Sequence, residues 1–431
     1  MAADLSARGA DASTGGEPGA LLLAEPVGRW ASAETTVGEI QRELRLLWAN
    51  RDLTTEVDGV RSRHVAARSS VMNLVVVAAD RAAAERAAAT LARLAGRRPS
   101  RTLVLVPVEP GGGAALRARI EAHCLLPRAG AAEICAELVH LEVAGAAGRH
   151  LDTVVTPLLV PDLPVTAWWP GEPAFGTEAT EAILALSDRL VVDGSGWSGD
   201  GLARLRTMAD RAARGGLAVS DFALVRQSRW REAIASVFDM PDLLPFLRHL
   251  RRIAVTYAVP EAGAALEAVN IVKPVYHVAW LASRLDLSVI EPLAPRELRH
   301  ATASGRSAVT RIRAALLHGP QGEVRVSIGP VESALPSGTT IGVELLAERR
   351  GSELRATIAA DAESIIVRGW LDGLAVVERS FLAPRRTEVD LLEEAIEPET
   401  GERIGAGALR FAAALIGPRP ETTIATTGDD A

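Results

Sequence analysis

Lysine is nearly absent from this chain. Of its 47 basic residues only Lys273 is a lysine, and the others are arginines. Together with the abundant alanine, this bias indicates the base composition of a genome, so a cluster of arginines is weak evidence of function. The net charge of −7 argues against a general nucleic-acid-binding protein, because such proteins are usually basic.

Cysteine is also scarce. The chain has two, Cys124 and Cys135, which is typical of a reducing compartment and does not resemble a disulfide framework. Cys135 follows an isoleucine in a strand pattern, so we expect a small buried residue there. A disulfide would require Cα atoms within about 7 Å of each other. The sequence leaves that pairing, and any response of the thiols to oxidants, open.

Long hydrophobic runs and metal-binding patterns are missing too. No apolar stretch approaches the roughly 18 residues that cross a bilayer, and "ALLLA" at 20–24 is too short for a signal peptide. His123 and His140 lie near the cysteines, but without a spacing used for zinc. We therefore expect a cytoplasmic protein that holds no metal or cofactor and contacts neither membranes nor nucleic acid.

The length of 431 residues exceeds one typical core, so two or more domains are expected. The composition of residues 1–33 and 417–431 predicts disordered tails. Between them we expect an α/β domain with a helical extension over 34–300, and an antiparallel β-sheet plus helices over 301–416. The stretch "LAPRELRHATASGRSA" (293–308) is the predicted boundary.

The α/β prediction rests on strand patterns that alternate with helical ones. "SVMNLVVVAAD" (70–80) is a dense β-branched run, as in strands buried on both faces, and "SRTLVLVPV" (100–108) is another. A helical pattern separates them, and the alternation predicts a mostly parallel sheet flanked by helices. Residues 199–285 are predicted to be largely helical, including "LLPFLRHLRRIAV" (243–255), and Pro274 is expected to kink or interrupt the last helix.

The C-terminal region is predicted from short segments separated by Gly, Pro or polar turns. "GEVRVSIGP" (322–330) and "SELRATIAAD" (352–361) alternate apolar and polar residues, which is typical of an antiparallel sheet with one solvated face. Helical patterns around 386–397 and 404–416 are expected to close this sheet.

One glycine-rich segment suggests nucleotide chemistry. Gly194, Gly196 and Gly199 match G-x-G-x-x-G after a strand pattern, with Asp221 about 22 residues further on. The strand stands at the end of the sheet rather than at its start, and Trp197 is bulky where a pyrophosphate must approach, which argues against this interpretation. A nucleotide- or sugar-phosphate-binding enzyme is the alternative. No nucleophile motif, P-loop or pair of acids indicates a catalytic residue, so the residues alone assign none.

Eight tryptophans stand out in a chain with only 4% aromatic residues. Trp168 and Trp169 end the strand pattern "LPVTAWW" before a Pro-Gly turn, and Trp197 follows another strand. The carboxyl ends of parallel strands share one edge of the sheet, where α/β proteins place their sites. The three indoles either fill gaps between strand ends and helices or form a rim that docks a partner.

Arg226 and Arg229 of "RQSRWREAIASVFD" (226–239) are the other candidate partner contacts. Helical spacing turns Trp230 toward the core together with the apolar residues that follow it. The two arginines project elsewhere, so they either meet a partner or lie on a solvated face.

Several of these segments together resemble a known family. "RSSVMNLVVVA", "RPSRTLVLVP", "EICAELVHLEV", "VTPLLVPDLPVTAWWPGEP", "DRLVVDGSGW" and "DFALVRQSRWREAIASVFD" occur in the order found in the glucose-6-phosphate dehydrogenase assembly protein family, OpcA, which this chain resembles over 34–290. The resemblance implies a non-catalytic partner that promotes the assembly or active state of glucose-6-phosphate dehydrogenase in the oxidative pentose phosphate pathway. The family's usual acidic-Ser-Ser run appears here as Asp193-Gly194-Ser195, which suggests that the glycine match arose by chance. The redox-linked cysteines of some members are not carried over to this chain.

Overall fold

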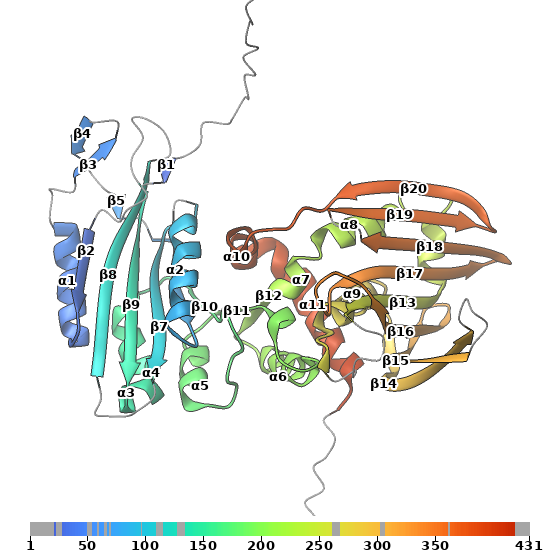
Figure 1. The fold of residues 1–431 in the computed structure, drawn as a ribbon, viewed down its shortest axis with the longest axis horizontal. Coiled ribbons are helices and arrows are strands. Elements are labelled where there is room, and N and C mark those ends of the chain that lie inside the picture. The colour runs from blue at the N-terminus through green and yellow to red at the C-terminus, as the bar shows by residue number, and fades with distance from the viewer. Residues whose placement is uncertain are drawn as a thin grey trace, which may run out of the picture.

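Two large sheets dominate the computed structural model, which describes residues 21–22, 28–49, 54–57, 60–63, 67–68, 70–95, 97–108, 115–126, 134–260, 268–301, 307–360 and 363–418. Figure 1 shows one sheet in each half of the chain, with a layer of helices between them. The main helices of this layer are α6 (Leu202–Ala213), α7 (Phe222–Val225), α8 (Ser228–Ser236), α9 (Val272–Arg284) and α11 (Pro398–Ile416).

The first sheet is parallel at its centre. β6 pairs in parallel with β7 on one side and β10 on the other, β9 follows β7, and β11 and β12 follow β10. β8 then runs antiparallel to β9. The predicted α/β fold with a mostly parallel sheet flanked by helices is therefore confirmed. Its main strands are β6 (Met72–Val77), β7 (Ser100–Val108), β8 (Ala115–Leu126), β9 (Ile134–Ala144), β10 (Val165–Trp168), β11 (Arg189–Val192) and β12 (Ala218–Asp221).

Alternating side chains of β6 enter two different cores. Val75 shares a core with Ile40 of α1 (Val37–Ala49), whereas Leu74 shares another with Ala87 of α2 (Arg81–Leu94). Successive residues of a strand point to opposite faces, so the dense hydrophobic run is buried on both. Asp80 caps α2 by accepting a hydrogen bond from a backbone N–H. Smaller helices complete the flanks of this sheet: α3 (Ala146–Arg149), α4 (Leu151–Val155) and α5 (Glu178–Ala185).

The predicted N-terminal tail, 1–33, is wrong for residues 28–32. These form β2 (Gly28–Ser32), antiparallel to β8, and Trp30 lies opposite Ile120 and packs on the core. Partial burial of that indole against the core favours the pairing of this segment with the sheet. Short strands β1 (Leu21–Leu22) and β5 (Ala67–Arg68) also pair with this sheet, and β3 (Thr54–Val57) pairs with β4 (Val60–Arg63). Residues 1–20, 23–27 and 419–431, the rest of the predicted tails, lie outside the described residues.

The helical prediction for residues 243–255 is wrong beyond His249. A 3-10 helix (Leu244–His249) leads directly into β13 (Leu250–Val259), a strand of the second sheet. Ile253, Val255 and Tyr257 alternate along β13 and are each 1% exposed, a period of two that fits a strand rather than a helix. Pro274 produces no kink, because α9 begins at Val272 and Pro274 falls in its first turn, where its missing N–H costs no helical hydrogen bond.

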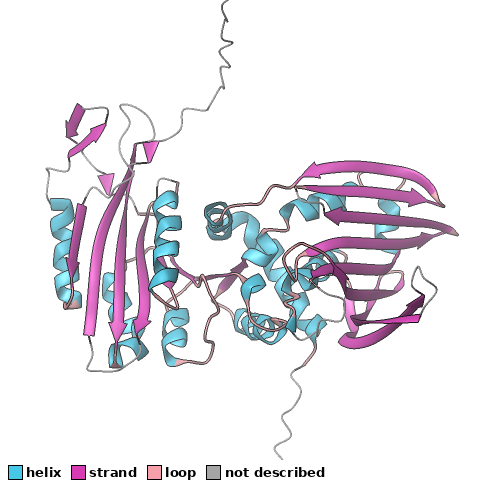
Figure 2. Cartoon of the chain, viewed as in Figure 1, coloured by secondary structure: helices cyan, strands magenta, loops and turns pink. Residues whose placement is uncertain are grey.

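The second sheet has eight strands in the order β14-β15-β16-β13-β17-β18-β19-β20, antiparallel except for the pair β13–β16. Buried and more exposed residues alternate along β18, so the expected solvated face is confirmed; Figure 2 shows the helices on the other side. The described residues of the predicted boundary segment, 293–301 and 307–308, belong to the end of β14 and the start of β15, which pair antiparallel in the second sheet. The strands are β14 (Ser288–Ala301), β15 (Ser307–Gly319), β16 (Gly322–Glu332), β17 (Thr340–Arg349), β18 (Ser352–Ala360), β19 (Ser364–Leu371) and β20 (Leu374–Leu382).

Helices form where the patterns around 386–397 and 404–416 predicted them, but they return the chain to the first sheet and the helical layer and do not simply close the second sheet. α10 (Glu388–Ile396) contributes Leu391 and Leu392 to the core that contains α2. α11 packs against α9 and α6. The end of the chain therefore fastens the two sheets to each other.

Candidate functional site

The three candidate tryptophans are all buried. Trp168 is 0%, Trp169 5% and Trp197 3% exposed. Trp168 packs 6.4 Å from the ring of Phe222 in one core, whereas Trp169 and Trp197 belong to the core on the opposite face. This burial fits the alternative in which the indoles fill the space between strand ends and helices. In this structure they support the carboxyl edge of the sheet without lying on its surface.

The glycine-rich loop is occupied by the protein's own acceptors. Five consecutive N–H groups, from Gly194 to Ser198, donate hydrogen bonds within the protein, three of them to carboxylates. A loop binds phosphate through N–H groups that point at the ligand, and these are already used. Asn270 covers the loop by donating to the carbonyl oxygens of Gly194 and Trp197. The geometry gives the nucleotide alternative no support at this loop.

Asp221, the acid that the dinucleotide motif would require, is turned inward. It is 3% exposed and accepts hydrogen bonds from the N–H groups of Gly194 and Ala223 and from the hydroxyl of Tyr276. Burial, and then the nearby charge of Asp193, raise the pKa of the Asp221 carboxyl to about 7. The residue therefore fastens the loop to α7 and α9 and is not available to a ribose.

The usual ligand position of such a sheet is also closed to anions. The strand order reverses between β6 and β10, which is where open α/β sheets form a ligand crevice. The turn after β6 consists of Ala78, Ala79 and Asp80, with no glycine. The carboxylate of Asp80 already satisfies the N-terminus of α2, so this helix end has no place for a phosphate.

Arg226 links the glycine-rich loop to a large cavity among the described residues. Its guanidinium donates to the carboxylate of Asp193 at 2.7 Å and to the hydroxyl of Ser195 at 3.1 Å. Burial alone would raise the pKa of Asp193, but the hydrogen bond and charge of Arg226 outweigh it and lower that pKa. Arg229 is exposed on α8 and pairs with Glu232 at 2.7 Å. Both predicted arginines line the same cavity.

This cavity has a volume of about 830 Å³ and lies between the helical layer and the second sheet. Its walls come from α8, the start of α9, the approach to β17, the facing ends of β18 and β19, and the segment before α10. We call it the junction cavity. Five cationic side chains line it against two carboxylates: Arg226, Arg229, Lys273, Arg385 and Arg386, against Glu232 and Glu394. An excess of positive charge is notable in a chain whose net charge is −7.

Lys273 is the functional candidate that the sequence analysis passed over. It lies in the first turn of α9 and faces the junction cavity. Burial, and then the charge of Arg226, lower the pKa of its ammonium group. Its being the single lysine of an arginine-rich chain was a signal that could have singled it out.

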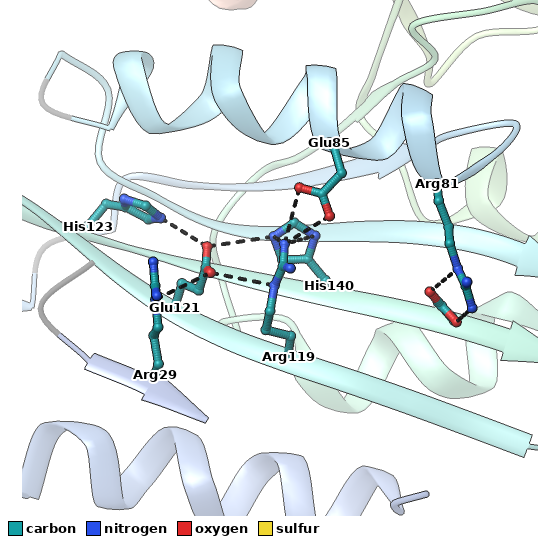
Figure 3. A network of polar contacts seen from close by, with 8 residues as sticks. Arg29, Arg81, Glu85, Arg119, Glu121, His123 and His140 are labelled. Carbon is teal, nitrogen blue, oxygen red and sulfur yellow. Dashed lines mark hydrogen bonds and ion pairs between the residues drawn. The ribbon is translucent and has the colours of Figure 1, made fainter. Parts of the chain in front are cut away.

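A separate polar cluster lies on β8 and β9, whose residues precede those of the junction cavity in the sequence. Figure 3 shows Glu121 at its centre, facing His123, His140, Arg119 and Arg29. The hydrogen bonds of His123 and then His140 hold the pKa of Glu121 well below its usual range. The charges in this cluster satisfy one another, so we assign it a role in joining β2, β8 and β9. Among the described residues, no three His, Cys, Asp or Glu side chains are grouped as metal ligands.

The two cysteines were expected to be typical of a reducing compartment, whereas the structure contains a disulfide. Cys135 is disulfide-bonded, and Cys124, the only other cysteine in the chain, lies directly opposite it in the antiparallel register of β8 and β9. The pairing of these strands brings the two backbones together, which spacing in the sequence alone could not show. The burial predicted for Cys135 is confirmed at 1% exposure.

The fold and site define a two-sheet protein with a cationic cavity between its helical layer and its second sheet. The chain belongs to the glucose-6-phosphate dehydrogenase assembly protein family, OpcA. The family pattern described as the glucose-6-phosphate dehydrogenase subunit N-terminal domain matches residues 91–210, and that of the C-terminal domain matches 217–405. The resemblance drawn from the sequence is thus confirmed.

Two curated relatives are similar to this chain. It is 25% identical over 197 residues to the putative OxPP cycle protein OpcA of Synechocystis sp., a match that covers 45% of this chain and 38% of the relative. It is 26% identical over 195 residues to the protein of the same name from Synechococcus elongatus, covering 44% and 41%. The chain thus spans about two fifths of the length of these relatives.

Two solved structures are distantly similar to this chain. A variant of a 3-ketoreductase from Actinomadura kijaniata is 14% identical with a TM-score of 0.38, covering 80% of this chain and 95% of the other. A biliverdin reductase from Synechocystis sp. is 10% identical with a TM-score of 0.39, covering 80% and 98%. Neither bears on the function of this chain. None of the helices in the described part is both long and apolar enough to cross a bilayer.

Proposed function

We propose that this chain is a non-catalytic assembly factor and allosteric activator of glucose-6-phosphate dehydrogenase in the oxidative pentose phosphate pathway. The observation that carries the proposal is the match of both family domains, which together extend from residue 91 to residue 405. The name of the two curated relatives, OxPP cycle protein OpcA, points to the same pathway.

Such a protein acts by binding one state of its target more tightly than another. A difference of about 1–3 kcal/mol between the two states shifts the target's activity by roughly 5- to 150-fold. This mechanism requires a surface complementary to one state of the target rather than a reactive group. The helical layer, fastened to both sheets by α10 and α11, is well suited to provide that surface.

We place the contact region on the exposed side of α8, around Arg229. Its side chain is 56% exposed, and its pairing partner Glu232 is 51% exposed, so both are accessible to a second protein. Arg226 is held by Asp193 and sets the position of α8 relative to the glycine-rich loop. Under this proposal Trp168, Trp169 and Trp197 act indirectly, by supporting the sheet edge from which these segments emerge.

The test mixes the purified chain with the dehydrogenase from the same organism. We expect a complex by sedimentation velocity, and a lower KM or a higher kcat for glucose 6-phosphate when the chain is present. Arg229→Glu should weaken the complex at least tenfold, whereas Arg311→Glu, on an exposed arginine of β15, should leave it unchanged. Absence of a complex together with unchanged kinetics would refute the proposal. An unaffected Arg229→Glu complex would refute only the contact region.

A further inference from the structure

Buried polar atoms without partners gather at the junction cavity. Gln227, His277 and Thr340 line it, and they are 3%, 2% and 4% exposed. The Oε1 of Gln227, both ring nitrogens of His277 and the Oγ1 of Thr340 have no hydrogen-bond partner among the described residues. Native interiors leave few such atoms unpaired. Four of them around one cavity indicate that a bound molecule supplies the missing partners.

Two cations of the same cavity are also unpaired. Among the described residues, the ammonium of Lys273 and the guanidinium of Arg385 make no hydrogen bond or ion pair, although both line the cavity. The other three cations are each engaged with a carboxylate: Arg226 with Asp193, Arg229 with Glu232 and Arg386 with Glu394. The part of the cavity near Lys273 and Arg385 therefore favours an anion.

We propose that the junction cavity binds a small phosphate ester that also carries hydroxyl groups. Lys273 and Arg385 contact the phosphate, because Arg and Lys are the side chains that bind phosphate oxygens best. The volume of the junction cavity lies within the range of small-molecule sites. Binding of the ester requires this chain alone. Only an effect of the bound ester on the dehydrogenase would rest on the proposed function.

The remaining atoms suit the hydroxyl groups of such an ester. Burial, and then the charges of Arg231 and Lys273, lower the pKa of His277 to about 3, so the ring is neutral and offers one donor and one acceptor. The Oε1 of Gln227 accepts a hydroxyl proton, since its amide nitrogen already donates to the carbonyl of Lys273 at 2.8 Å. Trp230, edge-on to the His277 ring at 5.1 Å, adds an apolar wall.

Isothermal titration calorimetry of the isolated chain tests the proposal with four probes. Glucose 6-phosphate represents sugar phosphates and NADP represents nucleotides, and both carry hydroxyl groups as well as phosphate. Glucose carries only hydroxyl groups, and inorganic phosphate lacks the hydroxylated carbon skeleton, so these two serve as control probes. We expect saturable binding of at least one ester, at least tenfold tighter than either control probe. Lys273→Met and Arg385→Met should each weaken it at least tenfold, and the exposed control Arg311→Met should not change it.

A second variant separates binding from folding. Thr340→Val removes an unpaired buried hydroxyl while nearly keeping the shape of the side chain, so it should raise the melting temperature of the unliganded chain. The same change should weaken the ester several-fold. Arg385 is exposed, so its variant reports on the phosphate even where Lys273→Met fails to fold.

Two results would overturn the inference. The first is the absence of binding by both esters, and the second is binding that neither Lys273→Met nor Arg385→Met weakens. Inorganic phosphate bound as tightly as the esters would refute the role given to Gln227, His277 and Thr340. The dehydrogenase is absent from these titrations, so their failure would leave the proposed partnership standing, and a missing complex would not affect them.

Discussion

Asp221 gives the sharpest prediction about pH and stability. Burial and the neighbouring Asp193 raise its pKa from 3.8 to about 7 in the folded chain. A carboxyl with a raised folded pKa binds its proton more tightly when folded. Its contribution to stability is therefore full below about pH 4 and is lost as the pH rises toward 7. Each pH unit of that window corresponds to about 1.4 kcal/mol, so this one group lowers the free energy of unfolding by up to about 4 kcal/mol at pH 8.

The perturbation is Asp221→Asn, which removes the charge and keeps the shape. Its side-chain oxygen can still accept from the N–H groups of Gly194 and Ala223, and its amide can donate to the hydroxyl oxygen of Tyr276. We expect the variant to be more stable than the natural chain at pH 8, by about 1–4 kcal/mol. The difference should shrink steadily toward pH 5.

Asp193→Asn is the matched control, because its neighbouring carboxyl has the opposite shift. Arg226 lowers the pKa of Asp193, so this carboxylate adds stability above about pH 4. Its loss should destabilise the chain at pH 8. Urea unfolding followed by tryptophan fluorescence from pH 5 to pH 8 measures both variants, and comparison with the natural chain at each pH cancels the contribution of His277. If Asp221→Asn destabilises at pH 8, or both variants move in the same direction, the reasoning is wrong.

Three further predictions, the first with a matched control, test local parts of the structure. Gly338 has φ 76°, and an added Cβ would lie 2.2 Å from a backbone oxygen, so Gly338→Ala should cost about 3 kcal/mol or more in urea unfolding. Gly351→Ala, at φ 86° with open space around it, should cost only about 1 kcal/mol, and equal losses would contradict the steric argument. Arg101→Met should lower the free energy of unfolding by about 3–5 kcal/mol, because it removes the guanidinium that pairs with Glu137, which is 1% exposed. A decrease below about 1 kcal/mol in urea unfolding would show that the ion pair is dispensable. Thr387→Ala removes the cap of α10 and should cost about 1 kcal/mol, and an unchanged melting temperature would refute the role of this cap.

The fold was predictable where a single segment carries its own pattern. Residues 72–77 are hydrophobic at every position of β6 except Asn73 because both faces of the strand are buried, and no distant residue is needed to see this. The strand β13 was missed because the preceding segment, Leu244–His249, is helical and the apolar period changes from helix to strand without a turn residue between them. Local periodicity shows an element clearly only when its boundaries are also marked.

The junction cavity could not be predicted in this way. Its walls are drawn from residues as far apart as Arg226 and Glu394, and only the fold brings them together. The same limit applies to Trp168 and Trp169. Their place at a strand end was readable, but their burial depends on helices that approach from other parts of the chain. A motif that spans only six residues, such as the glycine-rich loop, was easy to find. Its backbone N–H groups proved to donate to the carboxylates of Asp193, Asp221 and Glu172.

The location of the cavity connects ligand binding to the surface proposed for the partner. One wall is formed by α8, which carries Arg229, together with the start of α9, which carries Lys273, and the facing wall belongs to the second sheet and the segment before α10. A ligand shifts an equilibrium only through contacts that differ between two arrangements. An ester that contacts Lys273 on one wall and Arg385 on the other makes both contacts only when the walls stand at the observed spacing. We therefore expect a bound ester to favour this position of α8 and to strengthen binding of any partner that recognises it, by the same factor in each direction.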